Sequence, residues 1–381
     1  MKIVYLIDTL EIGGAERSLV DIATRSSLFD AVFITLYKGN TLESVLKGNN
    51  IKVYALNLPG KYAFAEAVKK IIPILKEVQP DLIHSTLFKA DIVSRRIKKK
   101  YPVPLINSFV NNSYVKDRYA KLNAFNKLKL YLFQCYDSIT SGAVDFFISN
   151  SETIKINNAK ALHVNPDKIK VIYRGRNIET FASVPTEKID ELDHSLGLKN
   201  KMVFLNVSRL LERKGQLDLL LAFAKIKAHN SQAVLLIAGE GNYKNVLEAK
   251  IRELNLESSC ILLGNRNDIP VLLQRADFFV FPSYYEGLPG ALIEAMMSRK
   301  KIICSDIPEN KECVSEKSAL IFRKGDVNHL AEKMQFALEN NASVYSMPEA
   351  AYQEALLKFD IESVIRQYAL TYEHVVANYK K

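Results

Sequence analysis

The sequence predicts an α/β protein of two domains, each built on a doubly wound parallel sheet. Three observations predict this class. Short apolar runs typical of strands alternate with helical patterns along the first half of the chain, which indicates strand–helix–strand units. The same rhythm restarts near residue 201. A chain of 381 residues is also too long for one hydrophobic core, so two domains are expected.

In the first half, runs rich in Val, Ile, Tyr and Phe mark the strands. The expected strands are 2–8, 31–37, 52–58, 81–85, 103–110 and 145–150. Apolar residues at helical spacing predict helices within 13–27, near 41–48, over about 62–79 and near 88–100, with further helical sequence between 110 and 145.

The second half repeats this order of elements. The expected strands are 201–208, 232–239, 259–264, 277–283 and 300–306. The expected helices are 214–228, 242–255, 267–275 and one from about Pro289. The segment 172–200 is polar and has no strand pattern, so we place the domain boundary there.

Composition bounds the class of protein. Apolar residues make up 48% and charged residues 25%, as in water-soluble globular proteins. The first apolar run ends at Asp8, and no later run reaches about 18 uncharged apolar residues, so we expect neither signal peptide nor membrane span and a cytoplasmic protein. The four cysteines lack metal-site spacing and are expected in the core.

The positive charge is uneven. Residues 1–180 hold 27 Lys and Arg against 16 Asp and Glu, whereas residues 181–381 hold 25 against 26. The first half therefore carries all of the net charge of +10, which indicates an anionic partner for that half.

Ligands of doubly wound sheets bind at the carboxyl ends of strands, and two such domains with facing carboxyl edges form a cleft. Gly13 and Gly14 follow the first strand and open a helix, which suits close approach of an anion. Neither a P-loop nor a G-x-G-x-x-G fingerprint is present, so an ordinary tight turn stays an alternative.

In the second half, Arg209 and Lys214 flank a helix start directly after a strand. Two cations beside helix N-terminal amides form a plausible pyrophosphate clamp. Ordinary surface charge is the alternative, and we prefer it for Arg213. Gly239 and Gly241 make a tight loop at the end of the expected strand 232–239, and the loop 264–269 follows the expected strand 259–264.

The stretch EGLPGALIE, residues 286–294, carries two acids around an apolar run. Pro289 suits the first turn of a helix, which leaves Glu286 in the loop before it. Glu294 then lies about a turn and a half into that helix among apolar neighbours, and is expected to be partly buried. A buried carboxylate needs partners, which ligand hydroxyls would supply. The alternative for Glu286 is an acid that stabilises the start of the helix. The alternative for Glu294 is a position on a solvated face of the helix.

Taken in order, these motifs resemble one family. S-R-x-x-x-x-K-G at 208–215, A-G-x-G at 238–241 and F-P-S-x-x-E-G-x-P-x-x-x-x-E-A-M at 281–296 look like the retaining family-4 glycosyltransferases of the GT-B fold. G-G-A-E at 13–16, D-L-I-H at 81–84 and S-N-S-E at 149–152 also match. The resemblance implies domains over 1–175 and 176–361, for acceptor and nucleotide sugar respectively. We expect a final helix, about 362–381, to pack back on the first domain.

The resemblance also implies roles. The implied donor contacts are Gly14, Arg209, Lys214, Gly239, Asn267, Ile269, Glu286, Gly287, Leu288, Pro289 and Glu294. Arg209 and Lys214 would hold the diphosphate, and Glu294 would take the ribose hydroxyls. Glu286, with the amides after it, would face the sugar. The loop 264–269 would receive the base, and Gly14 would approach the phosphates from the first domain.

The expected activity is retaining transfer of a sugar from a nucleotide diphosphate sugar, in our reading UDP-linked, to a lipid-linked or polysaccharide acceptor. Arg209, Lys214 and Glu286 are the expected catalytic residues, since cations stabilise the charge that grows on the leaving phosphate. The chain has no D-x-D, so neither a metal nor another cofactor is expected. A non-catalytic nucleotide-sugar-binding subunit and a nucleotide-sugar epimerase stay open as alternatives.

Two departures from the family pattern stand out. Relatives often carry a histidine after the strand at 103–110, where this chain has Val110 and Asn111. His84 lies on an earlier strand, and we read it as structural. Where relatives often read P-N-G near residue 173, Arg174 and Arg176 add charge, which would suit an anionic acceptor.

Basic residues gather in two segments of the first half. RRIKKK covers 95–100, and segment 114–137 mixes basic residues, including Lys121, with aromatic ones. Such mixtures suit binding to an anionic membrane surface or to nucleic acid. For RRIKKK the alternative is an ordinary solvent-exposed helix face without a partner. With the family resemblance, we expect peripheral binding to the inner face of the membrane and no nucleic acid.

Overall fold

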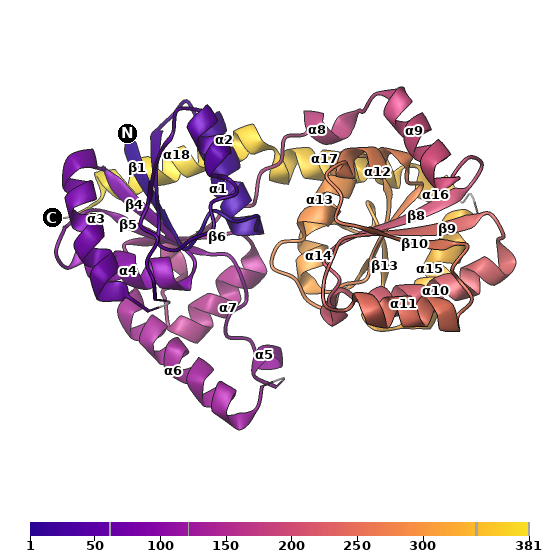
Figure 1. Ribbon diagram of the computed structural model, residues 1–381, viewed down its shortest axis with the longest axis horizontal. Coiled ribbons are helices and arrows are strands. Elements are labelled where there is room, and N and C mark those ends of the chain that lie inside the picture. Colours follow the sequence, from indigo (N-terminus) through magenta and orange to yellow (C-terminus); the bar gives the residue numbers. More distant parts are fainter. Residues whose placement is uncertain (61, 121, 340–341, 380–381) are drawn as a thin grey trace. The chain divides into compact units, whose positions relative to one another are not determined.

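Two parallel sheets organise the chain (Figure 1), in a computed structural model that describes residues 1–60, 62–120, 122–339 and 342–379. The chain divides into two units. The first comprises Met1–Gly175 and Ile361–Lys381, and the second comprises Arg176–Asp360. The first unit therefore contains the end of the sequence as well as its beginning.

The first unit carries a seven-stranded sheet in the order β3-β2-β1-β4-β5-β6-β7. Its strands are β1 (Lys2–Ile7), β2 (Asp30–Thr35), β3 (Lys52–Ala55), β4 (Leu82–Thr86), β5 (Leu105–Phe109), β6 (Phe146–Ser149) and β7 (Ile169–Val171). Every pairing is parallel, and β1 lies between β2 and β4. The strand order therefore reverses between β1 and β4, as in a doubly wound sheet.

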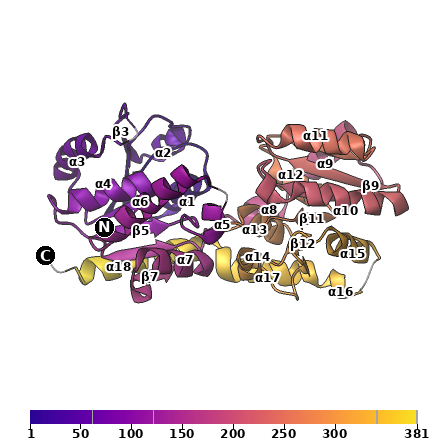
Figure 2. The ribbon, with the colours of Figure 1, turned by 90° about the horizontal axis from the view of Figure 1, so that it is seen from below.

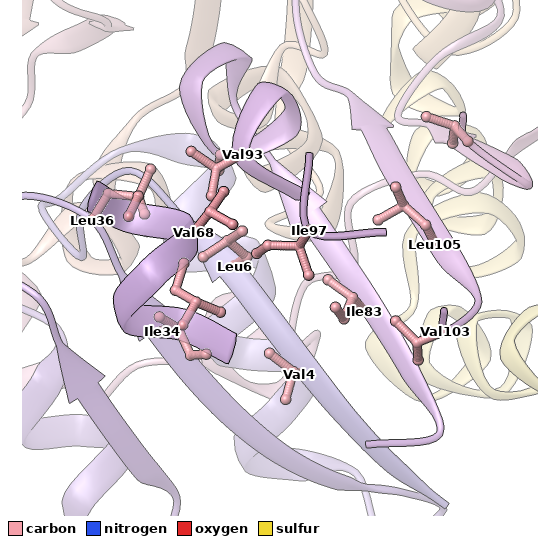
Figure 3. Close-up of a cluster of buried hydrophobic side chains, with 14 of the residues drawn as sticks. Val4, Leu6, Ile34, Leu36, Val68, Ile83, Val93, Ile97, Val103 and Leu105 are labelled. Atoms are coloured by element: carbon pink, nitrogen blue, oxygen red, sulfur yellow. The ribbon is translucent and has the colours of Figure 1, made fainter. Parts of the chain in front are cut away.

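Helices cover both faces of this sheet. They are α1 (Gly14–Arg25), α2 (Glu43–Gly48), α3 (Phe64–Val78), α4 (Phe88–Lys98), α5 (Lys116–Ala120), α6 (Ala124–Ser141), α7 (Glu152–Leu162) and α18 (Ile361–Ala377). Alternate residues of β1 point to opposite faces. Val4 and Leu6 pack with α3, α4 and α7, and Figure 3 shows part of this cluster. Ile3, Tyr5 and Ile7 pack with α1 and α18.

Helix α18 is tied to the first sheet by a buried polar network. The Tyr372 hydroxyl lies 3.0 Å from the Tyr5 hydroxyl and 2.7 Å from His84 Nδ1, and His84 Nε2 lies 2.6 Å from Ser108 Oγ. Burial lowers the pKa of His84 to about 3, so the ring is neutral in the folded protein. The structural role expected for His84 is confirmed, although it lies in the middle of β4 rather than at its end.

The second unit carries a six-stranded parallel sheet in the order β10-β9-β8-β11-β12-β13. Its strands are β8 (Met202–Val207), β9 (Ala233–Ala238), β10 (Cys260–Gly264), β11 (Phe278–Phe281), β12 (Lys301–Ser305) and β13 (Leu320–Phe322). Its order repeats that of the first sheet, and the reversal lies between β8 and β11. The expected fold class is confirmed.

Ten helices of the second unit lie in the described part of the chain. They are α8 (Glu179–Ala182), α9 (Thr186–Leu196), α10 (Gln216–His229), α11 (Lys244–Glu253), α12 (Ile269–Arg275), α13 (Gly290–Met297), α14 (Pro308–Cys313), α15 (Val327–Leu338), α16 (Ala342–Tyr345) and α17 (Met347–Phe359). Helices α10, α11 and α15 share one core with the sheet. Helix α13 packs against α17 and α14. Strand β13 and helices α14–α17 had no counterpart among the elements expected from the sequence.

Within residues 1–60, 62–120, 122–339 and 342–379, none of the helices has both the length and the apolar content to span a bilayer. Three of the cysteines are buried as expected, whereas Cys135 on α6 is only half-buried.

Candidate functional site

The reversal of strand order in the second sheet creates the place for a site. Strands β8 and β11 are neighbours there, so the segments that follow their carboxyl ends meet. After β8 the chain runs through Ser208 to Gly215, including a short 3-10 turn over Glu212–Lys214. After β11 it runs through Pro282 to Pro289 before α13 begins at Gly290.

Lys214 and Glu286 form an ion pair where these two segments meet. Lys214 Nζ lies 2.5 Å from Glu286 Oε1, and the side chains are only 10% and 7% exposed. The ammonium also lies 5.6 Å from the centre of the Phe281 ring. Burial lowers the pKa of Lys214, and the charge of Glu286 opposes that shift. Lys214 and Glu286, which the sequence analysis assigned to two different loops, are thus in direct contact.

A glycine lets the two segments approach. Gly215 has φ +70°, and a Cβ there would lie 2.1 Å from the Pro282 carbonyl oxygen, so no other residue fits without backbone movement. Gln216, the first residue of α10, donates from Nε2 to Ser208 Oγ at 2.8 Å and to the Arg209 carbonyl at 3.0 Å. The positive φ at Gly215 also explains why α10 begins at Gln216, later than the expected 214.

Arg213 belongs to this cluster, which corrects the expectation of ordinary surface charge. Its side chain is 22% exposed, with Nη1 3.8 Å from Glu286 Oε2. The same nitrogen donates to the Tyr285 carbonyl at 3.1 Å, and the guanidinium lies 5.1 Å from the centre of the Tyr285 ring. Arg209 is exposed, and its charge also acts on Lys214. Glu286 thus pairs with two cations, and the charge of Arg209 acts on one of them, so the positive charge gathered here suits an anionic ligand.

Glu294 is partly buried on α13, as expected, but its partner is a side chain of the protein. Arg176 Nε donates to Glu294 Oε1 at 3.0 Å, and the two side chains are 14% and 19% exposed. The sequence had suggested ligand hydroxyls for Glu294 and an anionic acceptor for Arg176. The ion pair gives each group one partner within the protein and positions the Glu294 carboxylate, and both expected ligand contacts stay predictions.

The remaining positions of the second unit fall around the same edge of the sheet. Gly239 follows β9 with φ +142°, and a Cβ there would lie 2.0 Å from the Ser208 carbonyl oxygen, so this glycine permits close packing of two strand ends. Asn267 is exposed in the loop after β10, and Ile269 is the first residue of α12.

Of the residues after Glu286, Gly287 is half-buried and Leu288 is buried. Pro289 immediately precedes α13 rather than lying in its first turn, and it has φ −78°.

Glu309 is a residue of this region that the sequence reasoning missed. It lies in α14, just after β12, and is 5% exposed. Burial raises the pKa of Glu309 and the charge of Glu286 adds to the rise, while the backbone N–H of Glu286 donates to the Glu309 carboxylate. The sequence does carry a signal for Glu309, because this acid comes shortly after the expected strand 300–306.

In the first unit, Gly14 begins α1 directly after Gly13, at the carboxyl end of β1. A Cβ at Gly14 would lie 2.6 Å from Arg174 Nη1, so the Arg174 guanidinium lies over this helix start. At the end of β5, Asn150 Nδ2 donates to the Val110 carbonyl at 3.3 Å and Asn158 Nδ2 to the Asn111 carbonyl at 3.0 Å. These amide contacts hold the loop in which relatives often carry a histidine.

The basic cluster RRIKKK is only partly exposed, since several of its side chains are bound within the first unit. Arg95 is 2% exposed and pairs through Nη1 with Asp137 Oδ1 on α6 at 2.6 Å. Arg96 Nη2 donates to the Tyr136 hydroxyl at 2.7 Å, and Lys98 pairs with Asp145. In this run only Lys99 and Lys100 are exposed.

Two doubly wound parallel sheets, with cations and a buried carboxylate at the switch point of the second, are the arrangement expected of a GT-B glycosyltransferase. Comparisons with known proteins agree. A model described as Glycosyl transferases group 1 matches residues 188–354, and one described as Glycosyltransferase Family 4 matches residues 12–180. The chain belongs to the group 1 glycosyltransferases.

Two relatives and one solved structure show how far the similarity extends. An Escherichia coli protein named UDP-Gal:alpha-D-GlcNAc-diphosphoundecaprenol alpha-1,3-galactosyltransferase is 32% identical over 62% of this chain and 60% of its own length. A Campylobacter jejuni N,N'-diacetylbacillosaminyl-diphospho-undecaprenol alpha-1,3-N-acetylgalactosaminyltransferase is 27% identical over 80% of both chains. The crystal structure of Anabaena HepE in complex with UDP shares the fold, with a TM-score of 0.85, 24% identity, and coverage of 98% of this chain and 100% of that one.

Proposed function

We propose that this glycosyltransferase moves a sugar from a UDP-linked donor to a lipid-linked acceptor, with retention of anomeric configuration, in the assembly of a cell-surface polysaccharide. The observation that carries the proposal is the excess of cations around Glu286 at the switch point of the second sheet. The undecaprenol-linked substrates in the names of two relatives support the acceptor class. Their printed α linkages support retention, since UDP-hexose donors are commonly α-linked.

The proposed reaction needs little covalent chemistry from the protein. The bond from the anomeric carbon to the UDP β-phosphate oxygen breaks, and a bond to the acceptor hydroxyl oxygen forms on the same face of the sugar. The acceptor proton passes to the departing β-phosphate, giving UDP and the glycoside. Arg209 and Lys214 would stabilise the negative charge that grows on that phosphate, more strongly in the transition state than in the bound donor.

The two carboxylates would act on opposite ends of the donor. Glu286 compensates Lys214 in the absence of donor, and with the amides of 287–289 it would position the sugar rather than attack it. Glu294, held by Arg176, would accept hydrogen bonds from the ribose hydroxyls. We further propose that no metal is required, because lysine and arginine side chains can supply the positive charge that a cation supplies in other transferases.

Calorimetric titration with UDP tests the donor site. Arg209→Met should weaken UDP binding about 10- to 100-fold, since a charge-assisted hydrogen bond is lost. Arg252→Met is the matched control, because Arg252 is an exposed arginine on α11 of the same unit, and its affinity should equal that of the wild type. Equal losses in both variants, or no UDP binding by the wild type, would overturn the proposed donor site.

Release of UDP from a panel of UDP-sugars, with and without a short-chain lipid-diphosphate saccharide, tests the reaction. Acceptor-dependent release that survives chelation with EDTA is expected. Binding of UDP without release from any donor would point instead to a non-catalytic subunit. Interconversion of donors without release would point to an epimerase.

A further inference from the structure

Helix α6 exposes a stripe of large apolar side chains. Phe125, Leu128, Leu132 and Ile139 are 75%, 58%, 59% and 81% exposed. Their spacing of three, four and seven residues places them on one face of the helix. The buried residues of α6 are Leu130, Asp137 and Ser141, which lie on the opposite face. We call the four exposed residues the α6 stripe.

The contacts that hold α6 leave the stripe uncovered. On the α4 side, Arg95 Nη1 pairs with Asp137 at 2.6 Å, and Figure 2 shows α4 and α6 as neighbours. On the α7 side, Gln134 Nε2 donates to the Ala161 carbonyl at 2.9 Å and Ser138 Oγ to the Leu162 carbonyl at 2.8 Å. Polar bonds thus fix the helix through its inner and lateral faces. Four large apolar side chains exposed on one face of one helix mark an interaction surface.

The charge around the stripe selects its partner. Lys127 and Lys129 are exposed on α6, and no acidic residue occurs from 118 to 136. The one acid of α6, Asp137, is buried in the pair with Arg95. A second copy of the chain is a poor partner, because its α6 would bring further lysines and no exposed acid to pair with Lys127 and Lys129. An anionic lipid surface complements both the apolar side chains and the lysines.

We propose that α6 is the membrane-docking element of this protein and lies in the plane of an anionic bilayer surface. The α6 stripe inserts among the acyl chains near the headgroups, while Lys127 and Lys129 contact anionic headgroups. Tyr131 is 57% exposed beside the stripe, and its amphipathic ring suits the headgroup level. This inference rests on the proposed function in that the lipid-linked acceptor would be reached from the membrane. It also narrows the basic surface expected from the sequence to one helix.

Co-sedimentation of the full-length protein with vesicles tests the inference. The vesicles contain phosphatidylcholine alone or with about 30 mol% phosphatidylglycerol, at low ionic strength. The wild type should bind the anionic vesicles. Leu128→Ser/Leu132→Ser should reduce that binding at least tenfold, and Lys127→Gln/Lys129→Gln should reduce it about fivefold per lysine. Leu357→Ser is the matched control, since this leucine of α17 is 82% exposed, and its binding should be unchanged.

The chain contains no tryptophan, which gives a second readout. Phe125→Trp places a single fluorophore in the stripe, and its emission should shift to the blue with anionic vesicles. Leu357→Trp should show no shift. Unchanged vesicle binding by Leu128→Ser/Leu132→Ser, or an unshifted Phe125→Trp, overturns the proposal. A wild-type dimer that the double serine variant turns into a monomer, without vesicle binding, also overturns it and assigns the stripe to self-association.

The same variants separate this inference from the proposed function. Leu128→Ser/Leu132→Ser should keep the wild-type affinity for UDP, because α6 carries none of the expected donor contacts, which apart from Gly14 belong to the second unit. A wild type that binds UDP but not anionic vesicles refutes membrane docking alone. A wild type that binds vesicles but not UDP refutes the donor site alone.

Discussion

Breaking the ion pair between Lys214 and Glu286 should destabilise the second unit strongly, whereas replacing both partners should not. The pair is 2.5 Å long and its side chains are 10% and 7% exposed, so neither charge is screened well by water. Removing one partner of a buried pair costs about 3–5 kcal/mol, because the other charge is left without compensation. At about 2–4 °C per kcal/mol for a unit of this size, Glu286→Leu or Lys214→Met should lower its Tm by about 6–20 °C.

The double variant Lys214→Met/Glu286→Leu should recover most of that loss, because an apolar pair of similar volume replaces a desolvated ion pair. The destabilisation of Glu286→Leu should also be smaller at pH 10 than at pH 7. Burial lowers the pKa of Lys214, and without Glu286 to oppose that shift the ammonium loses its proton more readily as the pH rises.

Thermal unfolding followed by circular dichroism measures these shifts. Because the two units can unfold separately, the transition that moves in both single variants reports the second unit. Lys244→Met is the control: Lys244 pairs with Glu240 in the same unit, but at 40% and 49% exposure, so its loss should cost at most about 1 kcal/mol. Single variants that match this control, or a double variant that equals the sum of the two, would refute the reasoning.

Other predictions concern the donor, the pH dependence and the glycines. Glu294→Gln should weaken UDP binding about tenfold and leave pyrophosphate binding unchanged, as calorimetry of both ligands would show; equal losses contradict a ribose contact. His84 has a folded pKa of about 3, below its unfolded value, so its contribution is present at pH 7 and is lost as the pH falls through 6.5. Urea unfolding at pH 7 and pH 5 should therefore lose about 2 kcal/mol more in the wild type than in His84→Gln, with exposed His163→Gln behaving as the wild type. Gly241→Ala should unfold at a much lower temperature, since its Cβ would lie 2.1 Å from a backbone carbonyl, whereas Gly142→Ala, with open space around it, should not; equal Tm values would contradict the clash.

The architecture was predictable because strand and helix patterns are local. Strands β8 and β11 are shorter than their expected ranges by one or two residues at each end, since the ladder hydrogen bonds that end a strand are not visible in the sequence. The start of α10 was predicted two residues early because apolar spacing does not register the positive φ of Gly215. Strand β13 has only three residues, too few to show an alternation.

The site residues were predictable as positions after strands, but their contacts were not. Lys214 and Glu286 lie 72 residues apart, and they meet only because β8 and β11 are neighbours, which follows from strand order and not from either motif. The pair of Arg176 with Glu294 spans 118 residues and depends on how the chain enters the second unit. Within one basic run, Arg95 is buried whereas Lys99 and Lys100 are exposed. Composition alone does not distinguish these residues.

The position of α18 has a consequence for how the protein is made. Tyr372 of this helix contacts Tyr5 and covers one face of the first sheet, yet the whole second unit is synthesised between the two. At about 5–20 residues per second, some 10–40 s separate the emergence of residue 175 from that of residue 361. During that interval Ile3, Tyr5 and Phe33 lack part of their cover. A nascent chain of this protein therefore exposes part of an apolar sheet face until α18 emerges.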